Sequence, residues 1–196
     1  MAGSSGVEKA LVGLSLAAGL GYPLLWSTGL PFAAEVALKG SGVAFLALAA
    51  ALGGGGTERR LLALVLACGA AGDVLLELAF MAGVAAFALG HAVAILLYVR
   101  NRRPAPPVSD HAVPGLLLAF GAAMPFLLLP ADGGAITFLP YSLLLSAMAA
   151  AAWLSRFPRA LTGLGAILFV ASDAFIAVRM GGNGFPGIGL AVWLLY

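Results

Sequence analysis

Residues 61–99 read LLALVLACGAAGDVLLELAFMAGVAAFALGHAVAILLYV, an almost continuously apolar run of 39 residues. As one straight helix this run would extend about 58 Å, which is close to twice the thickness of the hydrocarbon core of a bilayer. It must therefore turn back on itself, and we expect the turn near Met81, Ala82 and Gly83. The run thus predicts two consecutive membrane-crossing helices.

The composition of the whole chain also favours a membrane environment. Of its 196 residues, 62% are hydrophobic and only 9% are charged, whereas a soluble domain carries roughly 25% charged residues. So few charges could not cover the surface of the chain in water, and lipid is therefore expected to be its main solvent. Because no long polar stretch indicates a second domain, we expect one transmembrane domain over residues 1–196. It would be an integral, multi-pass protein of the inner or plasma membrane if the source is bacterial.

Turn-forming and charged residues divide the chain into further apolar segments. The pattern predicts an all-α fold, a polytopic transmembrane helix bundle of about eight helices. We interpret the first apolar segment as a spanning helix rather than a signal peptide. The last segment rises only about 16 Å, too little to span, so either it is short or the chain is trimmed there. The expected helices cover residues 8–26, 32–52, 61–80, 84–99, 112–129, 138–154, 160–179 and 186–196.

The basic residues predict the orientation of these helices. When the loops are assigned to alternate sides, eight basic residues fall on one side and only Arg179 falls on the other, while Lys39 lies inside a helix. Such a bias marks the cytoplasmic side, so both termini are expected to be cytoplasmic. The eight are Lys9, Arg59, Arg60, Arg100, Arg102, Arg103, Arg156 and Arg159.

Several function classes are excluded or disfavoured by what the sequence contains. The net charge is only +2 and the arginines form short, separate clusters, so no nucleic-acid partner is expected. The single Cys68 excludes a disulfide within the chain and a cysteine-based zinc site. Two histidines do not build a His-rich metal site, and no Walker, HExxH or dinucleotide motif is present. We therefore expect no metal and no cofactor, and the oligomeric state is not indicated.

Four ionisable residues inside the expected helices are the main candidates for a functional site. Such residues are costly in a membrane and usually line a cavity or pair with one another. Asp73 and Asp173 lie twelve and thirteen residues from the inner ends of their helices, and Lys39 and His91 lie seven from the outer ends of theirs. At a rise of 1.5 Å per residue, all four reach about the same level in the outer half of the bilayer. Four helices bringing titratable groups to one layer predict a shared pocket.

Three further polar residues accompany this layer. Glu77 lies one turn above Asp73 on the same helix face, and Glu35 lies one turn above Lys39. Tyr141 enters its helix near the outer surface. Of these, Glu77 and Tyr141 are candidate supporting residues of the site.

Each of these residues also has a purely structural interpretation. The aspartates could hold helices together through hydrogen bonds, Lys39 could only neutralise an aspartate, and His91 could be a satisfied donor between helices. Glu35 and Glu77 could be solvated at the interface, Ser172 could bond to its own backbone, and Cys68 could be a passive small hydrophobe. A Ser-His-Asp triad built from Ser172 or Ser146 with His91 is a further alternative.

Three motifs, taken in order, resemble the YhhN-like lysoplasmalogenase family. They are GDVLL at 72–76, FALGH at 87–91 and GAILFVASD at 165–173, and they match the family in type, order and spacing. Tyr141 and Met148 also resemble a tyrosine and a methionine on the corresponding helix of that family. The resemblance covers most of the chain, from the second expected helix to the start of the last.

The sequence departs from the family pattern at three places. Ala94 stands where the family often has a tyrosine three residues after the histidine, and Gly40 stands where a proline commonly follows the lysine. The last helix of the family usually continues past a final tyrosine, whereas this sequence stops at Tyr196.

The resemblance implies a membrane-embedded hydrolase that cleaves the vinyl-ether bond of lysoplasmalogens to a fatty aldehyde and a glycerophospho-base. Its partners would be a lysophospholipid-type ether substrate and membrane lipids. The essential aspartates of the family correspond to Asp73 and Asp173, an acid-base pair whose individual roles the sequence does not assign. Lys39, His91 and Tyr141 would orient groups or bind the phosphate, with support from the remaining members of the set, Glu77 and Ser172.

The alternative function is a transporter or a lipid-binding membrane protein. In that case the intramembrane acids would form a proton or substrate relay. The sequence shows no obvious inverted repeat and no pair of Gly/Pro-broken helices, which would favour a transporter.

Overall fold

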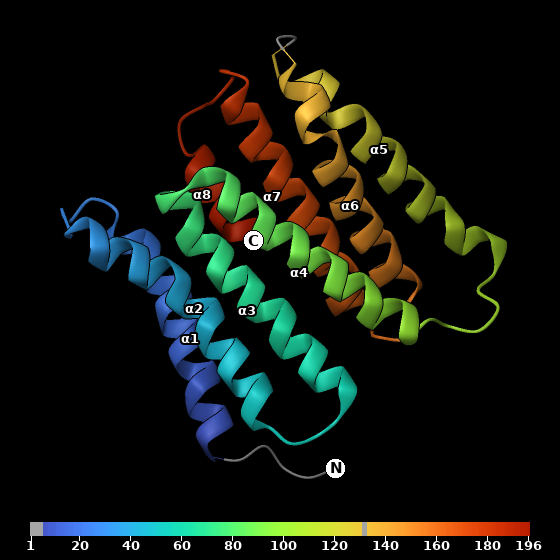
Figure 1. Ribbon diagram of the computed structural model, residues 1–196, viewed down its shortest axis with the longest axis horizontal. Coiled ribbons are helices and arrows are strands. Elements are labelled where there is room, and N and C mark those ends of the chain that lie inside the picture. The colour runs from blue at the N-terminus through green and yellow to red at the C-terminus, as the bar shows by residue number, and fades with distance from the viewer. Residues whose placement is uncertain (1–5, 131–132) are drawn as a thin grey trace. The chain divides into compact units, whose positions relative to one another are not determined.

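The computed structural model describes residues 6–130 and 133–196, and every regular element in these ranges is a helix (Figure 1). The described residues form eight α-helices, which confirms the prediction of an all-helical fold with about eight helices. A short 3-10 turn, η1 (Val108–His111), precedes α5, and a π-helical turn, η2 (Arg159–Gly163), leads into α7. The α-helices are α1 (Gly6–Leu25), α2 (Phe32–Leu52), α3 (Thr57–Leu78), α4 (Phe80–Arg100), α5 (Ala112–Leu128), α6 (Gly134–Leu154), α7 (Leu164–Met180) and α8 (Ile188–Leu195).

Six of the described helices are long and apolar enough to cross a membrane, counting the turns that lead into α5 and α7. They are α2 to α7, whereas α1 is not among the six. The eight residues of α8 rise only about 12 Å, which is less than half of a bilayer core. By length and composition the chain is therefore a multi-pass membrane protein. The cytoplasmic location of both termini stays a prediction, and residues 1–5 lie outside the described ranges.

The turn between α3 and α4 lies earlier than expected. Met81, Ala82 and Gly83 are inside α4, and the break is the single residue Ala79, whose backbone is extended (φ −156°, ψ 90°). The glycine that suggested a turn serves close packing instead. A Cβ atom on Gly83 would lie 2.5 Å from the backbone nitrogen of Leu76, so α4 can approach α3 only without a side chain there.

Five other helices begin at positions that differ from the expected ones, and the differences are largest for α3, α6 and α7. α3 starts at Thr57 and therefore includes Arg59, which was expected in the preceding turn. α6 starts at Gly134 rather than at residue 138, and α7 starts at Leu164, after the π-helical turn. Charged and glycine residues at these ends resemble loop residues in the sequence, although the backbone is already helical. Residues 131 and 132, before α6, lie outside the described ranges.

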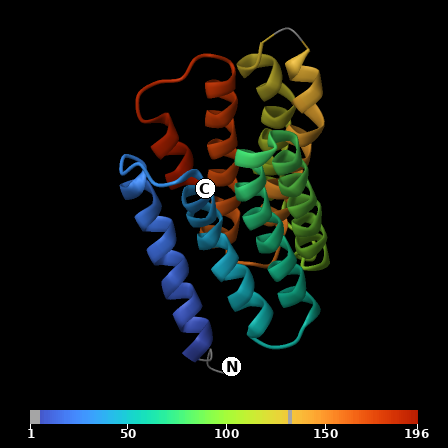
Figure 2. The same cartoon turned by 60° about the vertical axis from the view of Figure 1, so that its left-hand side comes forward.

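The chain forms two compact units, one ending at Leu97 and the other beginning at Tyr98, and each is described by itself. In the first unit α2 packs against both α1 and α3 (Figures 1 and 2). Gly40 of α2 faces α3, because a Cβ atom there would lie 2.7 Å from Val74. Gly72 of α3 likewise faces α4, where a Cβ atom would lie 2.6 Å from the ring of Phe87. Missing side chains thus allow three helices to pack closely.

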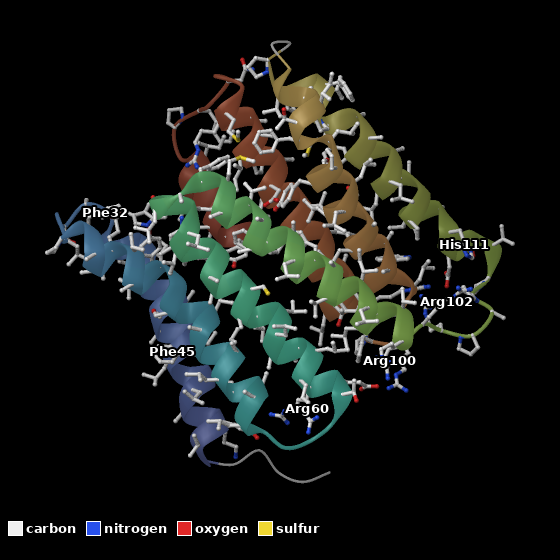
Figure 3. The ribbon with its side chains drawn as sticks, in the orientation of Figure 1. Phe32, Phe45, Arg60, Arg100, Arg102 and His111 are labelled. Carbon is white, nitrogen blue, oxygen red and sulfur yellow. The ribbon has the colours of Figure 1, made fainter. Side chains whose placement is uncertain are left out.

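One end of the first unit carries Arg59 and Arg60. Arg59, in the first turn of α3, donates hydrogen bonds to the carbonyl oxygens of Ala49 and Ala50 near the end of α2, each at 3.2 Å. It also pairs with Glu8 of α1 at 3.2 Å. A cation near the carbonyl groups at the C-terminal end of a helix is stabilising. In Figure 3, Arg60 lies at this end of the unit and Phe32, which begins α2, lies at the opposite end.

In the second unit, small and hydroxyl residues join α5 and α6. The Ser142 hydroxyl donates to the Gly121 carbonyl oxygen at 2.7 Å. A Cβ atom on Gly121 would collide with the side chain of Ser146, one turn further along α6. Both α6 and α8 pack against α7, and α8 lies beside α7 in both ribbon views (Figures 1 and 2).

Arginines cluster around Asp110 at one end of the second unit. Arg103 and Arg159 both bind the Asp110 carboxylate, the former at 3.3 Å. Arg103 also donates to the Trp153 carbonyl oxygen at 2.7 Å, and the Arg159 guanidinium lies 5.2 Å from the centroid of the Trp153 ring. Arg102 pairs with Ser155 through backbone bridging, which joins the α4–α5 connection to the turn after α6. Figure 3 shows Arg100, Arg102 and His111 in this connection.

The close approach of α4 to α3 generates the first prediction. Gly83→Ala should lower the free energy of unfolding by about 1–3 kcal/mol, because the added methyl group meets backbone atoms that cannot move aside. Gly115→Ala, in α5, is the matched control, because a Cβ atom there meets nothing within 4 Å. Alanine replaces a flexible glycine within a helix at that position, so its thermal transition in detergent should be unchanged or higher. Equal transitions for both variants would contradict the packing described.

Candidate functional site

Asp73 lies on α3 and is almost completely buried, with 3% of its surface exposed. The preceding Gly72 leaves room for the Phe87 ring of α4 to lie directly against α3. Phe87 in turn stacks with His91 one turn further on, with ring centroids 6.5 Å apart and planes inclined by 25°. The GD and GH motifs are therefore linked, because the Phe87 ring lies against Gly72 of the first motif and stacks with His91 of the second.

Lys39 of α2 and Glu77 of α3 form an ion pair with an N···O distance of 2.5 Å. The lysine side chain is 17% exposed and the glutamate side chain 42%. Because Glu77 follows Asp73 by four residues, the pair lies about one helical turn nearer the end of α3 than Asp73. Lys39 is therefore neutralised by Glu77, and not by an aspartate as its structural interpretation had expected. Glu77 is exposed, as its own structural interpretation expected, but its carboxylate is paired with Lys39.

His91 does not lie at the level of Asp73. Asp73 is five residues from the end of α3, whereas His91 is eleven residues from the start of α4, and the two helices meet at Ala79. His91 is therefore about 9 Å deeper in the hairpin. The contact of Gly90 with Cys68, five residues before Asp73, agrees with this depth. The expectation of four groups in one layer is thus wrong for His91, because it assumed a turn at residues 81–83.

In the second unit, the Tyr141 hydroxyl of α6 donates a hydrogen bond to the Asp173 carboxyl group of α7 at 2.6 Å. Tyr141 is seven residues from the start of α6, and Asp173 is seven residues from the end of α7, so the two lie at one level of this antiparallel pair. Both side chains are half-buried. The hydrogen bond holds one carboxyl oxygen of Asp173 and leaves the other to face its surroundings.

Ser172 connects α7 to α8. Its hydroxyl donates to the Val192 carbonyl oxygen at 2.9 Å, so the expectation that it bonds to its own helix backbone is wrong. The acceptor lies on a helix twenty residues further along the chain, and the sequence around Ser172 does not reveal such a contact. Ser172 is buried, and its hydroxyl fixes α8 next to the residue that precedes Asp173.

The serines do not support the alternative of a nucleophilic triad built from Ser172 or Ser146 with His91. The Ser172 hydroxyl is used by Val192, and Ser146 faces Gly121 of α5. Within the described residues, the buried Ser146 hydroxyl has no hydrogen-bond partner. Nor does the described part of the chain contain a group of three or more His, Cys, Asp or Glu side chains placed to hold a metal ion.

The candidate site therefore consists of two groups of residues, one in each unit. The first unit joins Lys39 to Glu77 and buries Asp73 near Phe87, with His91 deeper. The second unit joins Tyr141 to Asp173, with Ser172 behind them. Sequence reasoning missed the role of Phe87, although its position four residues before His91 on a helix predicts that the two rings share a face.

The comparisons with known proteins agree with the resemblance. The model of the YhhN family matches residues 34–196. Proteins named lysoplasmalogenase from Mycobacterium bovis and Mycobacterium tuberculosis are each 32% identical to the chain over 171 residues. The match covers 83% of this chain and 66% of each relative, so the chain spans about two thirds of the length of these curated relatives. No solved structure matches the chain.

The contact between Ser172 and Val192 generates the second prediction. Ser172→Ala should lower the stability by about 1 kcal/mol, because the hydrogen bond that joins α7 to α8 is lost. Hydrogen exchange should rise selectively in α8. Ser41→Ala is the matched control, because the Ser41 hydroxyl bonds only to Leu38 in its own helix. Unchanged exchange in α8 of the Ser172 variant would show that this bond does not hold the helix.

Proposed function

This chain belongs to the YhhN family, and from that premise we propose that it hydrolyses the vinyl-ether bond of lysoplasmalogens within the membrane. The products would be a fatty aldehyde and a glycerophospho-base. The named activity of the two mycobacterial relatives supports this proposal. The observation that carries it is the pair of motif aspartates, one almost completely buried and the other bound by a tyrosine hydroxyl.

The reaction begins with protonation of the double bond. A carboxylic acid gives its proton to the vinyl carbon farther from the ether oxygen, and the electron pair of the double bond forms the new C–H bond. The positive charge is then shared between the other vinyl carbon and the ether oxygen, as an oxocarbenium ion. A nearby carboxylate stabilises this ion, as in the cleavage of glycosidic bonds.

Hydration completes the cleavage. Water attacks the oxocarbenium carbon while the carboxylate accepts a proton from the water, which forms a hemiacetal. The C–O bond to the glycerol oxygen then breaks as the hemiacetal hydroxyl gives up its proton and the glycerol oxygen takes one, which releases the aldehyde and the glycerophospho-base. The pair of acids has given one proton to carbon and taken one from water, so a single proton now lies on the other carboxyl group, and its return restores the starting state.

We assign the two acid-base roles to Asp73 and Asp173 as a pair, without deciding which one protonates carbon. Tyr141 holds one oxygen of Asp173 at 2.6 Å and so fixes the direction of the other. His91 supports Asp73 indirectly, through the Phe87 ring on which it stacks. Lys39 lies one turn from Asp73 and binds the lipid phosphate, while Ser172 keeps α8 in place behind Asp173.

The proposed chemistry takes place in a single transmembrane domain. In each unit, basic residues lie at one end of the helices, with Arg59 in the first unit and the cluster around Asp110 in the second. Basic residues are enriched on the cytoplasmic side of membrane proteins, which supports cytoplasmic termini. Lys39, Asp73, Tyr141 and Asp173 all lie within seven residues of the opposite ends of their helices. A lysolipid therefore enters sideways from the outer half of the bilayer.

The third prediction concerns the aspartates. Asp73→Asn and Asp173→Asn should each reduce kcat by at least about a thousandfold, because an amide neither gives nor accepts the required proton. The measurement is aldehyde release from a lysoplasmalogen by purified protein. Asp110→Asn makes the same chemical change outside the proposed site and should keep most of the activity. Absence of turnover on any ether or ester lysolipid, with substrate flux across vesicles instead, would favour a transporter.

The fourth prediction concerns the tyrosine. Tyr141→Phe removes the donor to Asp173 but keeps the aromatic ring, so kcat should fall by about 10- to 100-fold with little change in KM. Tyr98→Phe is the control and should retain the wild-type kcat, because the Tyr98 ring packs on Phe157 near the C-terminal end of α4, away from Asp173 in the sequence. A full-rate Tyr141→Phe enzyme would exclude the positioning role.

A further inference from the structure

The ion pair between Lys39 and Glu77 is an unusual feature for a membrane-spanning helix pair. Placing two charges in the membrane is expensive even when they are paired, and apolar residues would join the helices at least as well. The neighbouring Gly40 already allows α2 to contact Val74 closely. The helices therefore have close packing at this level without the charges, and the pair calls for a role other than adhesion.

We propose that Lys39 and Glu77 form a head-group subsite that recognises a phosphate joined to an ammonium group. Lys39 binds the phosphate, and Glu77 binds the ammonium. The inference rests on the proposed function for its choice of lipid and adds the residue that reads the base. The side chain of Glu77 is the more exposed of the two, so it is the one accessible to the outer part of a head group.

The spacing along α3 fits the dimensions of such a lipid. About six bonds of roughly 1.5 Å separate the reactive vinyl carbon from the phosphorus atom, a span of about 7 Å when extended. Glu77 and its partner lie four residues from Asp73, which corresponds to about 6 Å along the helix. With the vinyl ether at Asp73, the phosphate therefore reaches the level of Lys39.

Charge balance explains why the base is needed. Binding a zwitterion exchanges one ion pair for two, and no charge is left without a partner. A phosphate alone would draw Lys39 away from Glu77 and leave an anion unpaired beside a second anion. Glu77 thus discriminates against a lipid that lacks the ammonium group, in addition to attracting one that has it.

The test compares two lysolipids that cannot be hydrolysed, because a saturated hexadecyl ether replaces the vinyl ether. One carries phosphoethanolamine and the other carries phosphate alone, and Kd is measured for the full chain in detergent. The wild type should bind the phosphoethanolamine lipid about tenfold more tightly or better. Glu77→Gln should reduce this ratio to near one. Glu58→Gln, at the other end of α3, should keep the wild-type ratio.

A charge-exchanged variant separates recognition from stability. Lys39→Glu combined with Glu77→Lys retains an ion pair, so its thermal transition should match the wild type, while its preference for phosphoethanolamine should be lost. A wild type without preference, a Glu77→Gln variant that keeps the ratio, or an exchanged variant that binds like the wild type would overturn the inference. If free phosphoethanolamine binds as tightly as the phosphoethanolamine lysolipid, the occupant of the subsite is not a lipid.

Aldehyde release distinguishes this inference from the proposed function. Head-group preference without turnover of a vinyl-ether lysolipid supports the subsite and contradicts the hydrolase. Turnover without head-group preference supports the hydrolase and contradicts the subsite.

Discussion

The absence of water from the hydrocarbon core is the constraint on which the structure depends. Each polar group within the spanning helices must find its partner inside the protein, since lipid offers none. The helix contacts follow this requirement: the Ser142 hydroxyl uses a carbonyl group of α5, the Ser172 hydroxyl uses one of α8, and Lys39 is paired with Glu77. The serine contacts thus join neighbouring helices of the second unit, and glycines set how closely helices approach in both units.

Much of the fold follows from hydropathy, because lipid imposes a minimum length on each helix. α2 spans residues 32–52, as the sequence predicts, and the eight helices appear in the expected order. Glycine was the source of the main error. At Gly83 the residue signals close packing, whereas the chain turns at Ala79 without a glycine or a proline. A one-residue turn between two apolar helices leaves no local pattern that a sequence can display.

The same error affects the candidate site. Counting residues from helix ends was accurate for Lys39, because α2 begins at the expected residue. The counts for Asp73 and Asp173 started four residues away from the observed ends, since α3 begins earlier and α7 later than expected. His91 lies about 9 Å deeper than Asp73, because α3 ends two residues and α4 begins four residues earlier than expected. The partners of Tyr141 and Ser172 depend on the direction of side chains between helices distant in sequence, which depth along the membrane does not supply.

The single extended residue between α3 and α4 has a consequence for biosynthesis. With only Ala79 between them, the two helices have no loop that could be translocated separately. They must leave the translocon as one helical hairpin, with the turn entering first. Asp73 and His91, both unfavourable in lipid alone, therefore reach the bilayer already shielded by the facing helix. The one-residue length of this turn thus allows the buried acid to enter the membrane together with the helix that faces it.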